Sequence, residues 1–329
     1  MGRVHGARKL KSNADSAVHL TGQKRQTGVV DPSMERQEAV LLVNTRSLKG
    51  AEWLDQAKQK LSEAGIELAV AQGFSKAPEL FHRAEEEAHG DRLVIVGGGD
   101  GTMSAVANIL AKTKCTMGVL PLGTGNAFAR DLGIPTDLDK AVEILVSGMA
   151  SEVDLGICDG KYFLNVITIG LTTTVAKTLT VPLKRRFGRF VYGIALLKAL
   201  RQTKPFLARI ETENGPTEIN TIELVIGNGR YHAGPLPLSP TAAITSGFLR
   251  LYAVEAGSTA GLIKYALLLP TGLQGILNTV HSERTAGGTI STTPVQSVVV
   301  DGEVSHKTPI QFSVEPLALK VMVPKSFKG

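Results

Sequence analysis

The first half of the chain alternates short apolar runs with stretches whose apolar residues recur at helical spacing. Leu93 to Val96 is a fully apolar run, which is typical of a strand buried on both faces of a sheet. Met103, Val106 and Leu110 follow at the intervals of a helix that begins at about Thr102. The same alternation predicts strands over 39–43, 66–72 and 117–121 and helices over 51–64 and 77–89. Strands and helices in this order predict a parallel, doubly wound α/β domain.

After residue 149 the pattern changes from helices to strands. Asp137 is the predicted cap of a helix that runs through Val146 and ends at Gly148. Apolar runs over 152–158 and 161–169, on both sides of Asp159-Gly160, predict a hairpin with a type I′ turn. Further strands are predicted over 208–213, 221–227, 249–255, 297–301, 310–315 and 319–323. We therefore expect a nucleotide-binding α/β domain over 38–149 and an antiparallel β domain over 150–325.

The net charge of +6 is concentrated at the start of the chain. Residues 1–28 contain six lysines and arginines against one aspartate, so the remainder is nearly neutral. A nearly neutral body lacks the basic surface that nucleic acids require, and we expect no nucleic-acid partner. Residues 1–37 are polar, basic and without period, which indicates a disordered tail, and they lack the apolar core of a signal peptide.

The spacing of the cysteines and the lengths of the apolar runs indicate where in the cell the protein is found. Cys115 and Cys158 lie far apart, in neither a metal motif nor a disulfide framework, which favours a reducing cytoplasm. The apolar stretch 262–277 is interrupted by Lys264, Pro270 and Gln274. No stretch reaches the roughly 18 uninterrupted apolar residues of a membrane span. We therefore expect a cytoplasmic protein that has no transmembrane segment and attaches to membranes peripherally.

Two glycine-rich turns carry the candidate chemistry. Gly97 to Thr102 joins a predicted strand to a helix, and Leu122 to Asn126 follows the strand over 117–121. Glycines let the backbone approach a phosphate, and a helix N-terminus offers free N–H groups and partial positive charge. Asp100 would repel a phosphate, so its carboxylate suits a metal ion or a substrate hydroxyl. Because both turns end neighbouring strands, we expect them to face one crevice.

GGDGT at 98–102, followed by PLGTGNAFAR at 121–130, resembles the catalytic domain of the diacylglycerol kinase superfamily. The soluble bacterial lipid kinases are the nearest members, with sphingosine and ceramide kinases as relatives, whereas NAD kinases share GGDGT but lack PLGTGN. The resemblance extends to GNGRYHAG at 227–234 and DGE at 301–303. It implies a C-terminal β-sandwich, an active site in the cleft between the domains, and ATP and Mg²⁺ as cofactors.

The resemblance also implies the nucleotide site. The predicted ATP contacts are Asn44, Ser47, Gly98, Gly99, Asp100, Gly101, Thr102, Ser104, Gly123, Thr124, Gly125, Asn126, Arg185 and Asp301. Ser47 has an alternative interpretation as an ordinary helix cap. Ser246 stands where the family has a magnesium-binding aspartate. A neutral hydroxyl is a poor sole anchor for Mg²⁺, so we expect that structural metal site to be weakened or absent.

Two acidic residues are candidates for the catalytic base. By resemblance, Glu303 matches the proton acceptor of diacylglycerol kinase relatives, and Asp100 matches the acceptor of sphingosine kinases. Either carboxylate would take the proton of a lipid hydroxyl as it attacks the γ-phosphorus of ATP. The sequence does not rank them, and one can accept the proton while the other holds the metal.

Three functions remain open. The first is an ATP-dependent kinase of diacylglycerol or a similar lipid alcohol, met at the membrane surface. The second is an NAD-kinase-like kinase of a small molecule, and the third is an inactive relative that binds nucleotide or lipid. The basic stretch within 176–206 could lie on anionic membrane or end a core helix. Assembly as a homodimer is also left open.

Overall fold

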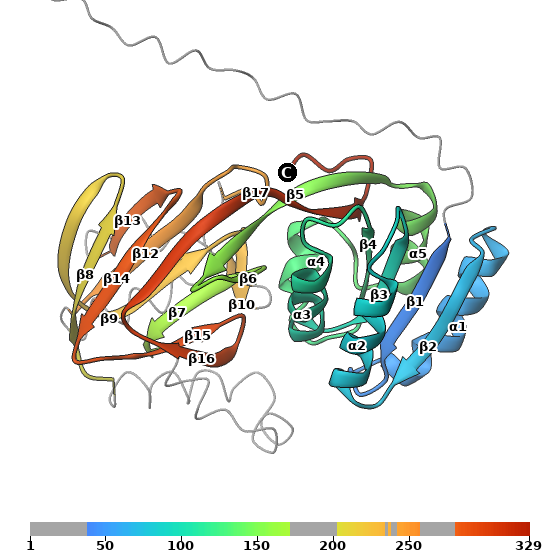
Figure 1. Ribbon diagram of the computed structural model, residues 1–329, viewed down its shortest axis with the longest axis horizontal. Helices are drawn as coiled ribbons and strands as arrows, with labels where there is room; N and C mark the ends of the chain where they lie inside the picture. Colours follow the sequence, from blue (N-terminus) through green and yellow to red (C-terminus); the bar gives the residue numbers. More distant parts are fainter. Residues whose placement is uncertain (1–37, 172–202, 234–235, 238–241, 257–279) are drawn as a thin grey trace, which may run out of the picture.

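The computed structural model describes residues 38–171, 203–233, 236–237, 242–256 and 280–329. The predicted tail over 1–37, the stretch that contains Arg185 and the apolar stretch over 262–277 lie outside the described residues. Two lobes make up the described chain, one with helices around a sheet and one of long antiparallel strands (Figure 1). Within the described ranges, no helix is long and apolar enough to cross a membrane.

The N-terminal lobe is a parallel sheet covered by helices on both faces. Strands β1 (Ala39–Asn44), β2 (Leu68–Phe74), β3 (Leu93–Gly98) and β4 (Thr116–Pro121) pair in the order β4-β3-β1-β2. They are connected by α1 (Gly50–Glu63), α2 (Ala77–Glu87) and α3 (Asp100–Leu110). Helix α2 packs on α3, and α1 packs on α5 (Leu138–Ser147). The predicted doubly wound fold is confirmed.

The neighbouring strands β1 and β3 define the place where a ligand would bind. The chain leaves β1 toward β2 on one side and leaves β3 toward β4 on the other. The carboxyl ends of β1 and β3 therefore form a topological switch point, which is the usual ligand position in an open α/β sheet. The apolar runs behind this edge, including 40–43 and 94–96, are fully buried.

The C-terminal lobe is antiparallel, as predicted. Its strands are β5 (Met149–Cys158), β6 (Lys161–Phe163), β7 (Val166–Gly170), β8 (Phe206–Thr212), β9 (Gly215–Gly227), β12 (Leu249–Glu255), β13 (Val280–Thr285), β14 (Gly287–Thr293), β15 (Ser297–Val300), β16 (Glu303–Lys307) and β17 (Ile310–Val323). The main hydrogen-bonded order is β16-β15-β7-β9-β8-β14-β17. The short strands β10 (Tyr231–Ala233) and β11 (Leu236–Pro237) form a separate hairpin.

Strand β17 joins the two lobes. It pairs antiparallel with β14 and β5, and its Val321 pairs in parallel with Met117 of β4. Figure 1 shows β5 and β17 running together from one lobe to the other. The sequence predicted two strands here, but they are one strand with a register shift between Glu315 and Leu319. At the shift Leu317 has φ of 54°, so the backbone bends without leaving the sheet.

The predicted hairpin at Asp159-Gly160 is confirmed in its turn and altered in its second strand. Asp159 and Gly160 have φ of 46° and 83°, as a type I′ turn requires. The second strand was predicted as continuous over 161–169 but is broken after Phe163. The N–H groups of Leu164 and Asn165 donate to the carboxylate of Asp301 instead, which removes them from the ladder.

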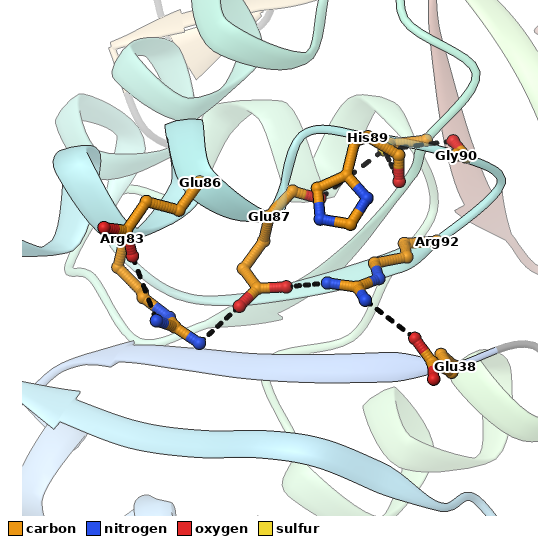
Figure 2. Close-up of polar contacts among 8 residues, drawn as sticks. Glu38, Arg83, Glu86, Glu87, His89, Gly90 and Arg92 are labelled. Carbon is orange, nitrogen blue, oxygen red and sulfur yellow. Dashed lines mark hydrogen bonds and ion pairs between the residues drawn. The ribbon is translucent and has the colours of Figure 1, made fainter.

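An ion-pair network holds the amino end of β3, opposite the glycine turns (Figure 2). Glu87, 4% exposed, pairs with Arg83 and Arg92, and Arg92 Nη2 lies 2.7 Å from Glu38 Oε2. A buried carboxylate needs charged partners of this kind. Next to it the Cys115 thiol points at main-chain carbonyls, 3.4 Å from the oxygen of Gly90. These contacts join α2 to the sheet and have a structural role.

Candidate active site

The two glycine turns lie side by side at the switch point, as predicted. Leu122 N donates to Gly98 O at 2.8 Å, which ties the second turn to the first. A Cβ on Gly123 would come within 2.6 Å of Gly99 Cα, so the two backbones are packed against each other. The third participant is Asn44 at the end of β1, whose Nδ2 donates to Thr102 Oγ1 at 3.0 Å. Three predicted ATP-binding segments therefore meet at one edge of the sheet.

Asn126 shapes the second turn from within. Its φ is 50°, in the left-handed region that asparagine tolerates better than most residues. Its Oδ1 accepts from Gly123 N and its Nδ2 donates to Gly123 O, both at 2.9 Å. The side chain is buried, whereas Thr124 between the two residues is exposed. The amide of Asn126 thus holds the turn in shape and leaves Thr124 open to a ligand.

Ser47 lies in the β1–α1 loop but does not cap the helix that follows. The N-cap of α1 is Lys49, and no side chain bonds there. The alternative interpretation of Ser47 as an N-cap is therefore wrong, because the chain makes an extra turn in which Ser47 N donates to Asn44 O at 3.0 Å. Ser47 remains a candidate ligand contact next to Asn44.

Asp100 is the first residue of α3 and reaches the start of α4 (Ala127–Asp131). Its Oδ1 accepts from Phe128 N at 3.3 Å, so the carboxylate joins the helices that follow the two glycine turns. Burial raises the pKa of Asp100 above its usual value, against the lowering effect of the main-chain N–H groups of Phe128 and its neighbours. The negative charge of Asp301 adds to the rise in the pKa of Asp100.

Asp301 connects the two lobes within the group of candidate acidic residues Asp100, Asp301 and Glu303, here called the acidic corner. Its Oδ2 accepts from the Ser104 hydroxyl at 2.6 Å and from Leu164 N at 2.8 Å. Its Oδ1 accepts from the N–H groups of Asn165 and Val166 at 2.9 and 3.0 Å. Both oxygens thus have main-chain donors, and Ser104, predicted to contact ATP, donates to Asp301.

The turn at Asp301 also sets where Glu303 begins its strand. Asp301 and Gly302 have φ of 47° and 90°, a two-residue hairpin turn between β15 and β16. Glu303 is the first residue of β16 and is exposed. In Figure 1 the tip of the β15–β16 hairpin points toward the helical lobe. The structure therefore places Asp301 against Ser104, one helical turn after Asp100 on α3, and leaves Glu303, two residues after Asp301, exposed to solvent.

Asp131, the last residue of α4, was not among the site residues predicted from the sequence. Its Oδ1 accepts from Arg230 N at 2.8 Å and its Oδ2 from Tyr231 N at 3.4 Å, in the loop that follows β9. A Cβ on Gly229 would meet Asp131 Oδ2 at 2.2 Å, so this loop has room only for glycine there. Burial raises the pKa of Asp131 to about 7. Asp131 thus connects the second glycine turn to the GNGRYHAG segment.

Asp154 of β5 was also missed. Its Oδ1 accepts from Leu317 N at 3.0 Å and its Oδ2 from Gly247 N at 2.6 Å. Its carboxylate thus supports both the bend of β17 and the turn at Ser246, whose hydroxyl donates within that turn to Phe248 O at 3.1 Å. Both aspartates bind main-chain N–H groups far away in sequence, so no local pattern could have revealed them.

The sequence comparisons agree with this geometry. Residues 38–158 match the family profile of the diacylglycerol kinase catalytic domain, and residues 165–323 match the YegS C-terminal NAD kinase beta sandwich-like domain. The chain is 34% identical over 219 residues to "Probable lipid kinase YegS-like" of Enterobacter sp. (strain 638), covering 65% of this chain and 73% of that one. It is 30% identical over 275 residues to a diacylglycerol kinase of Staphylococcus epidermidis (strain ATCC 12228), covering 83% and 87%.

A solved structure has the same fold. A candidate diacylglycerol kinase from Bacillus anthracis str. Sterne aligns with a TM-score of 0.76 at 24% identity, over 89% of this chain and 98% of that one. Two family profiles that together match most of the chain, and relatives that are 30% and 34% identical, define the class as that of the diacylglycerol kinases. The chain belongs to this family, whose relatives here are bacterial lipid kinases and diacylglycerol kinases.

Proposed function

We propose that this protein is an ATP-dependent lipid kinase that transfers the γ-phosphate of ATP to a hydroxyl of diacylglycerol or a similar lipid alcohol. The observation that carries the proposal is the packing of the two glycine turns against each other. Asp100 of the first turn accepts a hydrogen bond from Phe128 N just after the second turn, and Asp301 bonds to Ser104, one helical turn after Asp100 on α3. A phosphate-binding backbone next to a carboxylate is what phosphoryl transfer to an alcohol requires.

The nucleotide would bind at the switch point with its phosphates against the first glycine turn. Helix α3 starts there, so its N-terminal partial charge faces the phosphates, and Gly98, Gly99 and Gly101 keep side chains out of the way. Asn44, Ser47 and the exposed Thr124 surround the same edge and would contact the nucleotide. Arg185 lies outside the described residues, and its contact with ATP stays a prediction.

The acidic corner fits Mg²⁺ bound together with ATP. Mg²⁺ prefers one or two carboxylates plus substrate phosphates, and Asp100 and Glu303 offer carboxylate oxygens. Asp301 is less suited, because its oxygens already accept four hydrogen bonds from the chain. When bound, the metal would neutralise charge that develops on the phosphates.

The proton of the lipid hydroxyl would pass to Asp100 or Glu303 as the oxygen attacks phosphorus. Burial makes Asp100 a stronger base than an ordinary aspartate, because it raises the pKa of the carboxyl. Glu303 has the better access, because it is exposed at the start of β16. We leave both as candidate bases, and the carboxylate that does not take the proton would hold the metal.

The decisive assay uses γ-labelled ATP with Mg²⁺ and a panel of lipid alcohols presented in mixed micelles. Label in the organic phase after extraction is the expected result. Label transferred only to a water-soluble acceptor such as NAD would favour the small-molecule kinase, and no transfer despite ATP binding would favour an inactive relative.

Peripheral attachment to membranes is tested by flotation of the protein with anionic vesicles. Recovery of the protein in the bottom fraction would contradict peripheral attachment.

A further inference from the structure

Three side chains with metal-binding atoms meet in the β lobe, away from the glycine turns. Cys158 ends β5, Asp159 is in the β5–β6 turn, and His306 is on β16. Their ligand atoms all lie within 4.8 Å of one another. The thiol is buried, whereas the side chains of Asp159 and His306 are 34% and 20% exposed, so an ion could enter from their side.

The geometry of the pair His306 and Asp159 suits a small tetrahedral ion. His306 Nδ1 and Asp159 Oδ2 are 3.3 Å apart. In a tetrahedral zinc site with bonds of about 2.0–2.1 Å, neighbouring ligand atoms lie roughly 3.3–3.4 Å apart. The two atoms therefore already have the separation of two zinc ligands.

The carboxylate of Asp159 is held in place by its other oxygen. Asp159 Oδ1 accepts from Gln311 N at 2.8 Å, and Asp159 N donates to Gln311 O at 2.9 Å. These bonds to β17 leave Oδ2 directed at His306. Such second contacts, which fix the orientation of a ligand, are a regular feature of metal sites.

We propose that Cys158, Asp159 and His306 bind a zinc ion, with a water molecule in the fourth position. A thiol, an imidazole and a carboxylate together favour zinc over Mg²⁺ or Ca²⁺, which prefer oxygen ligands alone. The site is independent of the proposed kinase reaction.

Zinc binding would form a bond to sulfur and release the thiol proton to the solvent. The bound ion would cross-link the β5–β6 turn to β16, the strand that begins with Glu303. It would therefore stabilise the β lobe without touching the nucleotide edge.

The test uses the full chain, treated with a chelator and titrated with Co²⁺ as a spectroscopic probe. We expect a thiolate-to-cobalt charge-transfer band that saturates at one Co²⁺ per chain and is displaced by Zn²⁺. Cys158→Ser should abolish the band, and His306→Gln should weaken Co²⁺ binding at least tenfold. Cys115→Ser is the matched control, because Cys115 is also buried but its thiol hydrogen-bonds to main-chain carbonyls. It should keep the band.

Wild-type protein without a thiolate band would overturn the proposal and leave His306 and Asp159 as a pair of side chains in contact without a metal. A band that survives Cys158→Ser, or that disappears in Cys115→Ser, would also overturn it. If Cys158→Ser does not fold, the wild-type titration and the His306→Gln variant decide, since His306 is partly exposed on an edge strand. Thermal unfolding gives a second readout, with Zn²⁺ expected to raise the unfolding temperature of wild type and Cys115→Ser.

Discussion

The hydroxyl of Ser104 donates a hydrogen bond of 2.6 Å to Asp301, a residue 197 positions further along the chain. Ser104 is in the first turns of α3, and Asp301 begins the turn before β16. The bond therefore joins the helix that follows the first glycine turn to the hairpin that carries Glu303. It is one of the contacts that hold the two halves of the proposed site against each other.

This relationship predicts a graded loss of stability. Asp301→Ala should lower the free energy of unfolding by about 2–4 kcal/mol, because it leaves three main-chain N–H groups without their acceptor. Ser104→Ala removes one hydrogen bond and should cost about 1 kcal/mol. Urea denaturation measures both, and the exposed Glu67→Ala serves as control with a change below about 0.5 kcal/mol. Equal losses in the two variants would contradict this role of Asp301.

The close approach of the two glycine turns predicts that Gly123 tolerates no side chain. Gly123→Ala should lower stability by about 1–3 kcal/mol and weaken ATP binding, because its Cβ would lie 2.6 Å from Gly99 Cα. Gly101→Ala is the matched control for stability, since a Cβ there has nothing within 4 Å and alanine favours the helix. Stability is read by urea denaturation and ATP affinity by calorimetry. A Gly123→Ala variant as stable as Gly101→Ala would show that the turns can separate.

Replacement of the two candidate bases should separate chemistry from folding. Asp100→Asn keeps an oxygen for Phe128 N and removes a buried charge, so the variant should fold while its turnover falls at least about 100-fold. Glu303→Gln changes an exposed residue and should leave the unfolding transition within about 0.5 kcal/mol. Turnover is measured with saturating ATP and lipid. A variant that keeps wild-type turnover excludes its residue as the base.

The pKa of Asp131 predicts a specific pH dependence of stability. Burial raises this pKa from 3.8 to about 7 in the folded protein. Between these values the unfolded chain has already lost the proton that the folded protein retains, so this group lowers stability as pH rises from about 4 to 7. Burial is the largest cause of the rise in the pKa of Asp131. The negative charge of Asp100 adds to the rise, and the positive charge of Arg230 opposes it.

Asp131→Asn removes this titration while keeping an acceptor for Arg230 N. The difference in unfolding free energy between the variant and wild type should therefore move in favour of the variant from pH 5 to pH 8. Chemical denaturation at several pH values measures this difference, in which the other titrating groups cancel. A constant difference across that range would mean that Asp131 is ionised throughout in the folded protein.

Local patterns predicted most of the α/β lobe. The runs at 39–43 and 93–96 are buried strands, and the helix after Asp137 has the predicted cap, with Asp137 Oδ1 accepting from Lys140 N at 3.1 Å. The periods of helices and strands depend on neighbouring residues, and a glycine turn before a helix is a local signal as well.

The same approach failed for β13, β14 and β16, because sequences such as HSERT, GGTISTT and EVSHK lack a regular apolar alternation. These strands are held by pairing with β12, β8 and β15 instead.

The sequence by itself determined the order of strands and helices in the α/β lobe, the two glycine turns and the presence of acidic residues at 100, 301 and 303. Only the tertiary structure decided what those acids touch: Asp301 binds main-chain N–H groups and Ser104, and Asp131 binds the loop after β9. It also brought Cys158 and His306 together from distant strands. The reason is physical, since periodicity reports which face of an element is buried, whereas hydrogen bonds to the main chain depend on where the chain passes in space.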